Sequence, residues 1–211
     1  MTKKETIISL ICNIANAVLT AVSVLRFFIS RGDGNMAVSG SRAFRFFTVD
    51  SNILAALASV CLICFCIGSL RRNGEPVPVG TAVFQFVGTS AITLTLMTVL
   101  LFLGPTMGYG TMFVGSSLYM HLINPLLCII TFVLVEKGPE IPLKYLPLGV
   151  LPTLLYGAVY IVMAVASNRW PDFYGFNRGG MWYISLPVMT AASVGIAYAL
   201  LRLRNYFCRR S

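Results

Sequence analysis

Residues 116–135 read SSLYMHLINPLLCIITFVLV, an apolar run of the length that crosses a bilayer as a helix. The run contains His121, the single histidine among the 211 residues of the chain. An ionisable ring is costly in hydrocarbon, so such residues face a bundle interior or a wet cavity and often mark functional sites. This stretch therefore predicts a membrane helix that carries a candidate functional residue.

The whole chain has the composition of a membrane protein. Hydrophobic residues make up 57% of it and charged residues 11%, whereas soluble domains carry about 25% charged residues. Because the backbone must satisfy its own hydrogen bonds in lipid, we expect the apolar stretches to be helices. We predict an all-α polytopic membrane protein, one domain over residues 1–211, with a polar interior cavity in a six-helix bundle. The spans are placed at about residues 6–28, 46–69, 81–103, 116–135, 147–167 and 183–203.

The net charge of +9 is interpreted through membrane topology. If six spans alternate, ten of the 16 Lys and Arg residues fall on the side of the termini and six on the other. The positive-inside rule then places both termini in the cytoplasm. We expect a bacterial cytoplasmic (inner) membrane, because the loops are compact and no eukaryotic targeting motif is found. The first span is expected to remain in the mature protein, since its apolar run exceeds that of a signal peptide.

The partner classes follow from the same composition. Membrane lipids are the expected substrate or ligand, and nucleic acid is not, because topology and head-group contact explain the basic residues. Cys61-x-x-Cys64 lies within an apolar helix without a second pair, so we interpret it as packing rather than a metal or redox motif. With one histidine and few carboxylates, neither a metal nor another cofactor is expected.

Polar residues inside four of the predicted spans recur at spacings of three, four and seven, which places each set along one helical face. Such stripes either hydrogen-bond between helices or line a cavity. Four stripes in six helices favour a cavity. The sets are Asn13, Asn16, Thr20 and Ser23; Thr48, Asn52 and Ser59; Ser117, His121, Asn124 and Cys128; and Thr153, Tyr156 and Tyr160.

Thr48 is the best candidate partner for His121. Both residues lie near the outer start of their spans, roughly 3 Å and 8 Å below it at ~1.5 Å rise per residue. A hydroxyl becomes a nucleophile when an adjacent imidazole accepts its proton. The pair therefore predicts a threonine nucleophile with a histidine base, although Thr and His in a bundle also serve as structural residues.

Several neighbours are predicted to support this pair. Asp50 needs a partner in a membrane, and the nearest candidates are the arginines at 26, 42 and 45. Asn52 shares the face of Thr48 and could donate a hydrogen bond to an oxyanion. Asn124 shares the face of His121, and Pro125 frees the His121 carbonyl. The supporting or substrate-binding residues are thus Arg45, Asp50, Asn52, Asn124, Asn16 and Tyr156.

Three short motifs resemble a known family. FFTVDSN (46–52), MHLINP (120–125) and the six spans resemble the androgen-induced-gene family of intramembrane threonine hydrolases and its bacterial six-span relatives. The loop WPDFYGFN (170–177) is similar to the aromatic loop of those bacterial relatives. The resemblance implies a catalytic Thr48 and His121. It also implies hydrolysis of fatty-acyl esters such as fatty acid esters of hydroxy fatty acids.

The sequence leaves three functions open. The first is a lipid ester hydrolase that uses Thr48 and His121. The second is a lipid- or solute-binding or transport protein without catalysis, in which polar stripes line a cavity. The third is a structural membrane protein, in which the same residues set the helix register.

Overall fold

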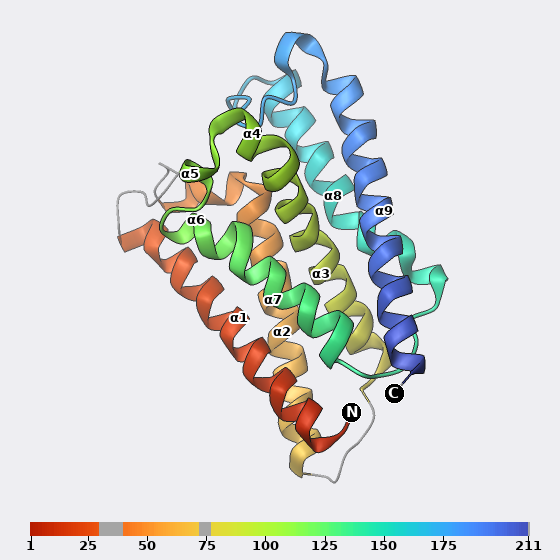
Figure 1. Cartoon of the computed structure of the whole chain (residues 1–211). Coiled ribbons are helices and arrows are strands. Elements are labelled where there is room, and N and C mark those ends of the chain that lie inside the picture. Colours follow the sequence, from red (N-terminus) through yellow and green to blue (C-terminus); the bar gives the residue numbers. More distant parts are fainter. Residues whose placement is uncertain (30–39, 72–76, 211) are drawn as a thin grey trace.

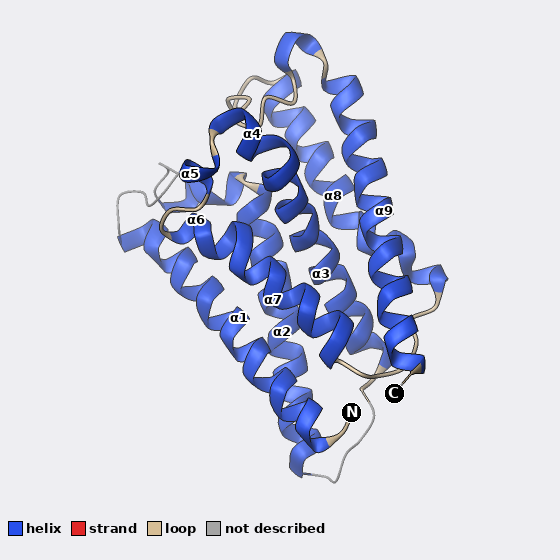
Figure 2. Ribbon diagram, viewed as in Figure 1, coloured by secondary structure: helices blue, strands red, loops and turns tan. Residues whose placement is uncertain are grey.

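The computed structural model describes residues 1–29, 40–71 and 77–210 (Figure 1). These residues form helices and loops, with no strand among them (Figure 2). Six helices are long and apolar enough to cross a membrane, which suggests a multi-pass membrane protein and confirms the prediction of an all-α, six-span bundle. They comprise Lys3–Ile29, Phe47–Arg71, Val79–Met107, Ser116–Val135, Leu143–Ala166 and Trp182–Arg209.

Several spans are built from more than one helical element. In chain order the elements are α1 (Lys3–Ile29), η1 (Gly40–Arg45), α2 (Phe47–Arg71), α3 (Val79–Thr98), η2 (Val99–Leu103), α4 (Gly104–Met107), α5 (Tyr109–Met112), α6 (Ser116–Leu118), η3 (Tyr119–Ile123), α7 (Asn124–Ile130), η4 (Thr131–Val135), η5 (Leu143–Tyr145), α8 (Leu146–Tyr160), η6 (Ile161–Ala166), η7 (Arg178–Gly180) and α9 (Trp182–Arg209). The fourth span is therefore α6, η3, α7 and η4 in continuous succession.

A proline explains the widened turn in the fourth span. Pro125 has no N–H, and its ring would collide with the carbonyl four residues earlier, which belongs to His121. The preceding turn, η3, is π-helical, and the N–H of Asn124 donates to the carbonyl of Tyr119, five residues back. The same arrangement, a π-helical turn before a Gly-Pro pair, ends α3 at η2. Single π-helical turns often occur at functional sites, and η3 carries His121.

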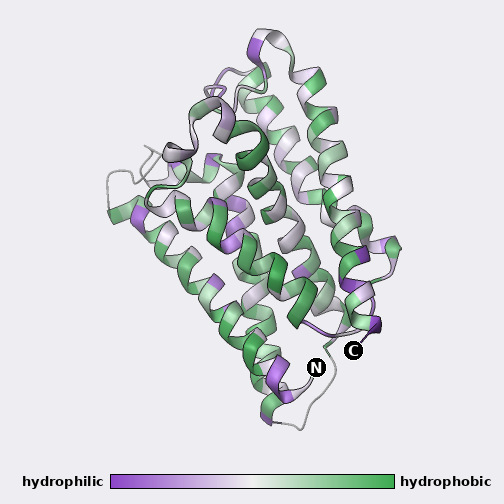
Figure 3. Cartoon of the chain, viewed as in Figure 1, coloured by the Kyte–Doolittle hydropathy of each residue, from purple (hydrophilic) through white to green (hydrophobic). Residues whose placement is uncertain are grey.

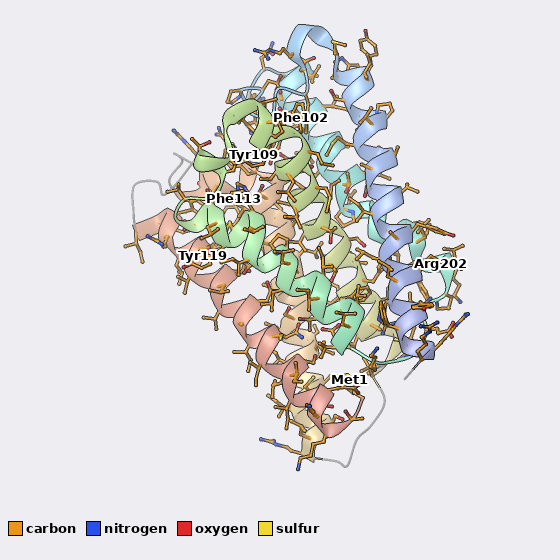
Figure 4. The ribbon with its side chains drawn as sticks, in the orientation of Figure 1. Met1, Phe102, Tyr109, Phe113, Tyr119 and Arg202 are labelled. Carbon is orange, nitrogen blue, oxygen red and sulfur yellow. The ribbon has the colours of Figure 1, made fainter. Side chains whose placement is uncertain are left out.

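The third span occupies the centre of the bundle. It packs against α2, α7, α8 and α9, while α1 pairs with α2 and α8 pairs with α9. Both termini lie at one end of the bundle (Figure 1). Phe102, Tyr109 and Phe113 lie toward the opposite end, far from Met1 (Figure 4). Figure 3 shows that hydrophobic residues cover most of the six helices.

The first helix, α1, buries its polar face and exposes its apolar face. The buried residues are Thr6, Ser9, Asn13, Asn16, Thr20, Ser23 and Phe27. The exposed face carries large aliphatic and aromatic side chains such as Ile11, Val18, Leu25 and Phe28. This is the reverse of a helix on the surface of a soluble protein. It fits a helix whose outer face contacts lipid and whose inner face hydrogen-bonds to its neighbours.

Hydrogen bonds between polar side chains join the spans. Asn16 Nδ2 donates to Ser59 Oγ over 2.9 Å and links α1 to α2. The hydroxyls of Ser51 and Thr95 lie 2.8 Å apart and link α2 to α3. The predicted polar stripes therefore lie in the interior, where many of their members bond to one another.

Gly88 allows the closest approach of α2 to α3. A Cβ atom built on Gly88 would lie 2.9 Å from Ala55 Cα and 3.3 Å from Ala55 N, both of them backbone atoms. Gly80, in the same helix, has no atom within 4 Å of the corresponding position. The two glycines thus provide a matched pair of sites.

We expect Gly88→Ala to destabilise the protein by about 1–3 kcal/mol, because the backbones of two packed helices must separate to admit one methyl group. Gly80→Ala, as the control, is expected to stay within about 0.5 kcal/mol of the wild type. Thermal unfolding of both variants in detergent measures the difference. Equal Tm values for the two variants would contradict the close packing.

Candidate functional site

Thr48 lies in the wall of a pocket at the end of the bundle opposite the termini. The pocket lies between α2, α3, α8, α9 and the loop of residues 167–181, and the space in it that water-sized groups can fill is about 70 Å³. Most of its wall is apolar or aromatic, and the polar part consists of hydroxyl groups. The lining residues are Phe47, Thr48, Leu94, Thr95, Thr98, Val99, Leu103, Thr153, Tyr156, Gly157, Tyr160, Ile161, Tyr174, Phe176, Trp182, Ser185, Leu186 and Met189.

Tyr174 brings a phenol from the loop to Thr48. Its hydroxyl interacts with the hydroxyls of Tyr156 and Thr48, yet it is fully buried without a hydrogen bond of ordinary geometry to any described residue. The Tyr156 hydroxyl donates instead to the carbonyl of Arg45 over 2.7 Å. Burial raises the pKa of Tyr174 to about 12, an effect that the hydroxyls of Tyr156 and Thr48 partly offset. The Tyr174 hydroxyl is therefore protonated at neutral pH and available as a donor.

Asp172 holds the loop that carries Tyr174. Its Oδ1 accepts hydrogen bonds from the Tyr160 hydroxyl (2.5 Å) and the Phe176 N–H (2.9 Å). Its Oδ2 accepts one from the Asn177 N–H (2.9 Å). Since these donors come from α8 and from the loop itself, one carboxylate fixes both the shape of the loop and its position over the pocket.

We expect Asp172→Ala to loosen this loop, because three hydrogen bonds to one carboxylate are lost and hydrogen bonds to charged groups contribute about 1.5–3 kcal/mol each. The amide protons of Phe176 and Asn177 should exchange faster, and trypsin should cleave faster after Arg178. Hydrogen exchange and limited proteolysis measure these changes. Glu140→Ala serves as the control, since Glu140 is exposed and pairs with Arg209 of α9. If the amide protons of Phe176 and Asn177 exchange at the same rate in Asp172→Ala as in the wild type, Asp172 does not hold the loop in place.

His121 is buried in η3 and has a defined ring orientation. Its Nδ1 lies 2.8 Å from the carbonyl oxygen of Met112. A carbonyl can only accept a hydrogen bond, so Nδ1 carries the proton and Nε2 is the nitrogen that can accept another. In this tautomer Nε2 is the nitrogen that can act as a base.

A pair of asparagines joins the helices that carry Thr48 and His121. Asn124 Nδ2 donates to Asn52 Oδ1 over 3.0 Å. The second and fourth spans run in the same direction, Thr48 precedes Asn52 by four residues, and His121 precedes Asn124 by three. Thr48 therefore lies about 6 Å from Asn52 along its helix, and His121 lies about 4.5 Å from Asn124 along its own. The two residues are thus at nearly the same depth in the bundle.

The structure does not join the two candidate catalytic side chains directly. No hydrogen bond connects Thr48 to His121, both of which are described, and His121 is absent from the residues that line the pocket. Tyr156, by contrast, lines the pocket beside Thr48 as expected of a residue near the nucleophile. Among the described polar side chains of the loop, Tyr174 is the one that reaches Thr48.

The two asparagines have structural partners that occupy their donors. Asn52 Nδ2 donates to the carbonyls of Thr48 (2.7 Å) and Met120 (3.0 Å). Asn124 Nδ2 donates to Thr20 Oγ1 (3.0 Å) as well as to Asn52. The expectation that Asn52 donates to an oxyanion therefore does not fit this arrangement, because its N–H groups are already bonded within the bundle.

None of the remaining predicted supporting residues lines the pocket at Thr48. Asp50 is half-buried in a separate groove beside Trp170, and no ion pair joins it to an arginine of the described chain, so the expected pairing is not found. Asn16 lines a different pocket nearer the termini. Arg45 contributes its backbone carbonyl to Tyr156.

The sequence analysis did not single out Tyr174 and Asp172 as candidate functional residues. Their only signal was the motif WPDFYGFN (170–177), which carries no helical periodicity to indicate where its side chains point.

Among the described residues, no three His, Cys, Asp or Glu side chains are grouped to hold a metal ion. No family model matches the chain, and neither does any curated protein or solved structure.

The asparagine pair can be tested by a double-mutant cycle. We expect Asn52→Ala and Asn124→Ala each to destabilise the protein by about 1–3 kcal/mol, because each leaves buried polar partners unsatisfied. The double variant should show a coupling of about 0.6–1.7 kcal/mol, the range found for hydrogen bonds between membrane helices. Unfolding in detergent or bicelles gives the four free energies of unfolding. Strict additivity would show that the pair does not hold the two spans together.

Proposed function

We propose that this protein is an intramembrane lipid ester hydrolase of the kind that the androgen-induced-gene family and its bacterial six-span relatives represent. Its substrates are fatty-acyl esters such as fatty acid esters of hydroxy fatty acids. The observation that carries the proposal is the position of the Thr48 hydroxyl, which lies in the wall of an apolar pocket beside the unpartnered hydroxyl of Tyr174. Such a pocket suits an acyl chain with a polar ester group at one point along it.

In the proposed first step, Thr48 Oγ1 attacks the ester carbonyl carbon and its proton passes to His121 Nε2. The C–O bond to the leaving group then breaks, and the leaving alcohol takes the proton from His121. Water hydrolyses the acyl-threonine in the second step, again with His121 as base, and the proton returns to Thr48 Oγ1. One ester and one water molecule thus give one acid and one alcohol.

Two observations support the roles of the neighbouring groups. The hydrogen bond from His121 Nδ1 to the Met112 carbonyl leaves Nε2 free to act as the base. The asparagine pair holds the turns of Thr48 and His121 at one level. The proposed mechanism requires the side chains of Thr48 and His121 to come together when substrate binds, since catalytic hydrogen bonds often tighten only in the substrate complex.

Tyr174 is proposed to donate a hydrogen bond to the oxyanion. Its hydroxyl is protonated at neutral pH and lies next to the nucleophile. A donor at this position stabilises the negative charge of the tetrahedral intermediate. Tyr174 takes the role that the sequence had suggested for Asn52.

The orientation in the membrane follows from charge. Since ten basic residues fall at the end of the termini and six at the other end, we propose that both termini are cytoplasmic. The pocket then lies in the outer leaflet of a bacterial cytoplasmic membrane, where a lipid ester can enter it.

One observation favours a second function. Because His121 does not line the pocket, the shape of the pocket fits a protein that binds lipid without catalysis as well as it fits a hydrolase. In that case Tyr174 would hydrogen-bond to a carbonyl of the bound lipid, and no bond would be broken.

Purified protein incubated with a panel of long-chain fluorogenic esters and hydroxy-fatty-acid esters tests the proposal. We expect Thr48→Val and His121→Ala to lower kcat by at least about 100-fold, since each removes a group that acts in the transition state. Thr48→Ser, which keeps a hydroxyl, should retain part of the activity. Thr190→Ala, a threonine of α9 that does not line the pocket, is the matched control and should hydrolyse the esters like the wild type.

The outcome also separates the two functions. Hydrolysis by the wild type that Thr48→Val preserves would reject Thr48 as the nucleophile. Saturable binding of the esters without hydrolysis would support the lipid-binding function instead.

A further inference from the structure

A second, much smaller pocket lies between α1, α3 and the fourth span, nearer to the termini. The space in it that water-sized groups can fill is about 10 Å³, which admits roughly one water molecule or one small ion and no lipid. Helix α1 supplies Asn13 and Asn16, and α3 supplies Gln85 and Thr89. The fourth span supplies Thr131 together with Glu136, which directly follows its last residue.

Glu136 places a buried carboxylate in this pocket. It is 5% exposed, and its Oε1 accepts hydrogen bonds from Asn13 Nδ2 (3.1 Å) and Gln85 Nε2 (3.3 Å). No ion pair joins it to a lysine or arginine of the described residues. A buried carboxylate normally requires a paired charge or a metal ion.

The nearest basic residue, Arg204, is held in another direction. Its Nη1 donates to the Pro139 carbonyl over 2.8 Å, and its guanidinium lies over the Phe132 ring, 5.2 Å from the centroid. Arg204 attracts the Glu136 carboxylate electrostatically, although no hydrogen bond joins the two side chains among the described residues. One face of the carboxylate therefore remains directed at the pocket.

Two further oxygens of the pocket, Asn16 Oδ1 and Thr131 Oγ1, accept no hydrogen bond from another described residue. Asn16 is 1% exposed and its Oδ1 has no hydrogen-bond partner, while its Nδ2 is fixed by the bond to Ser59. Thr131 Oγ1 donates its proton to the Leu127 carbonyl over 2.7 Å, so its lone pairs remain unused. A carboxylate and neutral oxygens without a matching donor suit a cation.

We propose that this pocket binds one sodium ion, with the Glu136 carboxylate and the Asn16 amide oxygen as ligands and the Thr131 hydroxyl as a further oxygen. Hard cations prefer oxygen ligands. A monovalent ion suits this site better than a divalent one, because Arg204 already contributes a positive charge near the single carboxylate. The site is independent of the proposed hydrolase pocket, with which it shares no lining residue.

A sodium ion here would join α1 to the fourth span, so binding should stabilise the folded protein. We would measure Tm of the full-length protein in detergent at constant pH and ionic strength while NaCl replaces choline chloride. We expect a saturable rise of Tm with Na⁺ in the wild type and a weaker response to K⁺. The same preparation should bind ²²Na⁺ with a stoichiometry of about one per chain.

The variants locate the site. Glu136→Gln should abolish the response to Na⁺, and Asn16→Ala should raise the half-saturating Na⁺ concentration by about tenfold or more. Glu140→Gln, an exposed acid four residues further on, should respond like the wild type. Asn16→Ala and ²²Na⁺ binding by the wild type keep the test decisive where Glu136→Gln does not fold.

Three outcomes would overturn the proposal. Identical melting in sodium and choline salts would show that water or a proton alone occupies the pocket. An equal rise of Tm with every salt would indicate that the salts only screen surface charge. Retention of ²²Na⁺ binding by both Glu136→Gln and Asn16→Ala would place the ion elsewhere.

Discussion

The amide group of Asn124 joins three spans, and the end of the bundle opposite the termini depends on it. It donates to Thr20 of α1 and to Asn52 of α2, and Asn52 donates in turn to the carbonyl that precedes His121. Lipid offers no alternative partners, so these groups must find one another or remain unsatisfied. This junction fixes the depth in the bundle at which Thr48 and His121 lie.

Hydropathy and periodicity were sufficient to predict the six spans and the buried faces, because lipid excludes polar backbone and polar side chains alike. They could not predict what each buried face would meet. The stripe of α1 bonds to Ser59 and Asn124, whereas the pocket at Thr48 has largely apolar walls. A helical repeat gives the direction of a side chain relative to its own axis, and the partner depends on tertiary packing.

The loop residues show the same limit more strongly. Tyr174 and Asp172 lie in a segment without regular structure, so no repeat indicates that one enters a pocket and the other braces the loop. Asp50 forms no ion pair with an arginine of the residues that the structure describes, and the reason is similar, since proximity in sequence says little about arginines on other elements. Pro125 is the opposite case, because its missing N–H acts locally and predicts the altered turn at His121 directly.

The inverted polarity of α1 has a consequence for biogenesis. Its buried asparagines and hydroxyls find partners on α2, α3 and the fourth span, and Asn124 follows Thr20 by 104 residues. During synthesis the first two helices must therefore enter the bilayer with part of this polar face unpaired, until the fourth span arrives. A helical hairpin in that state is a natural client for an insertase or membrane chaperone that shields polar groups from lipid.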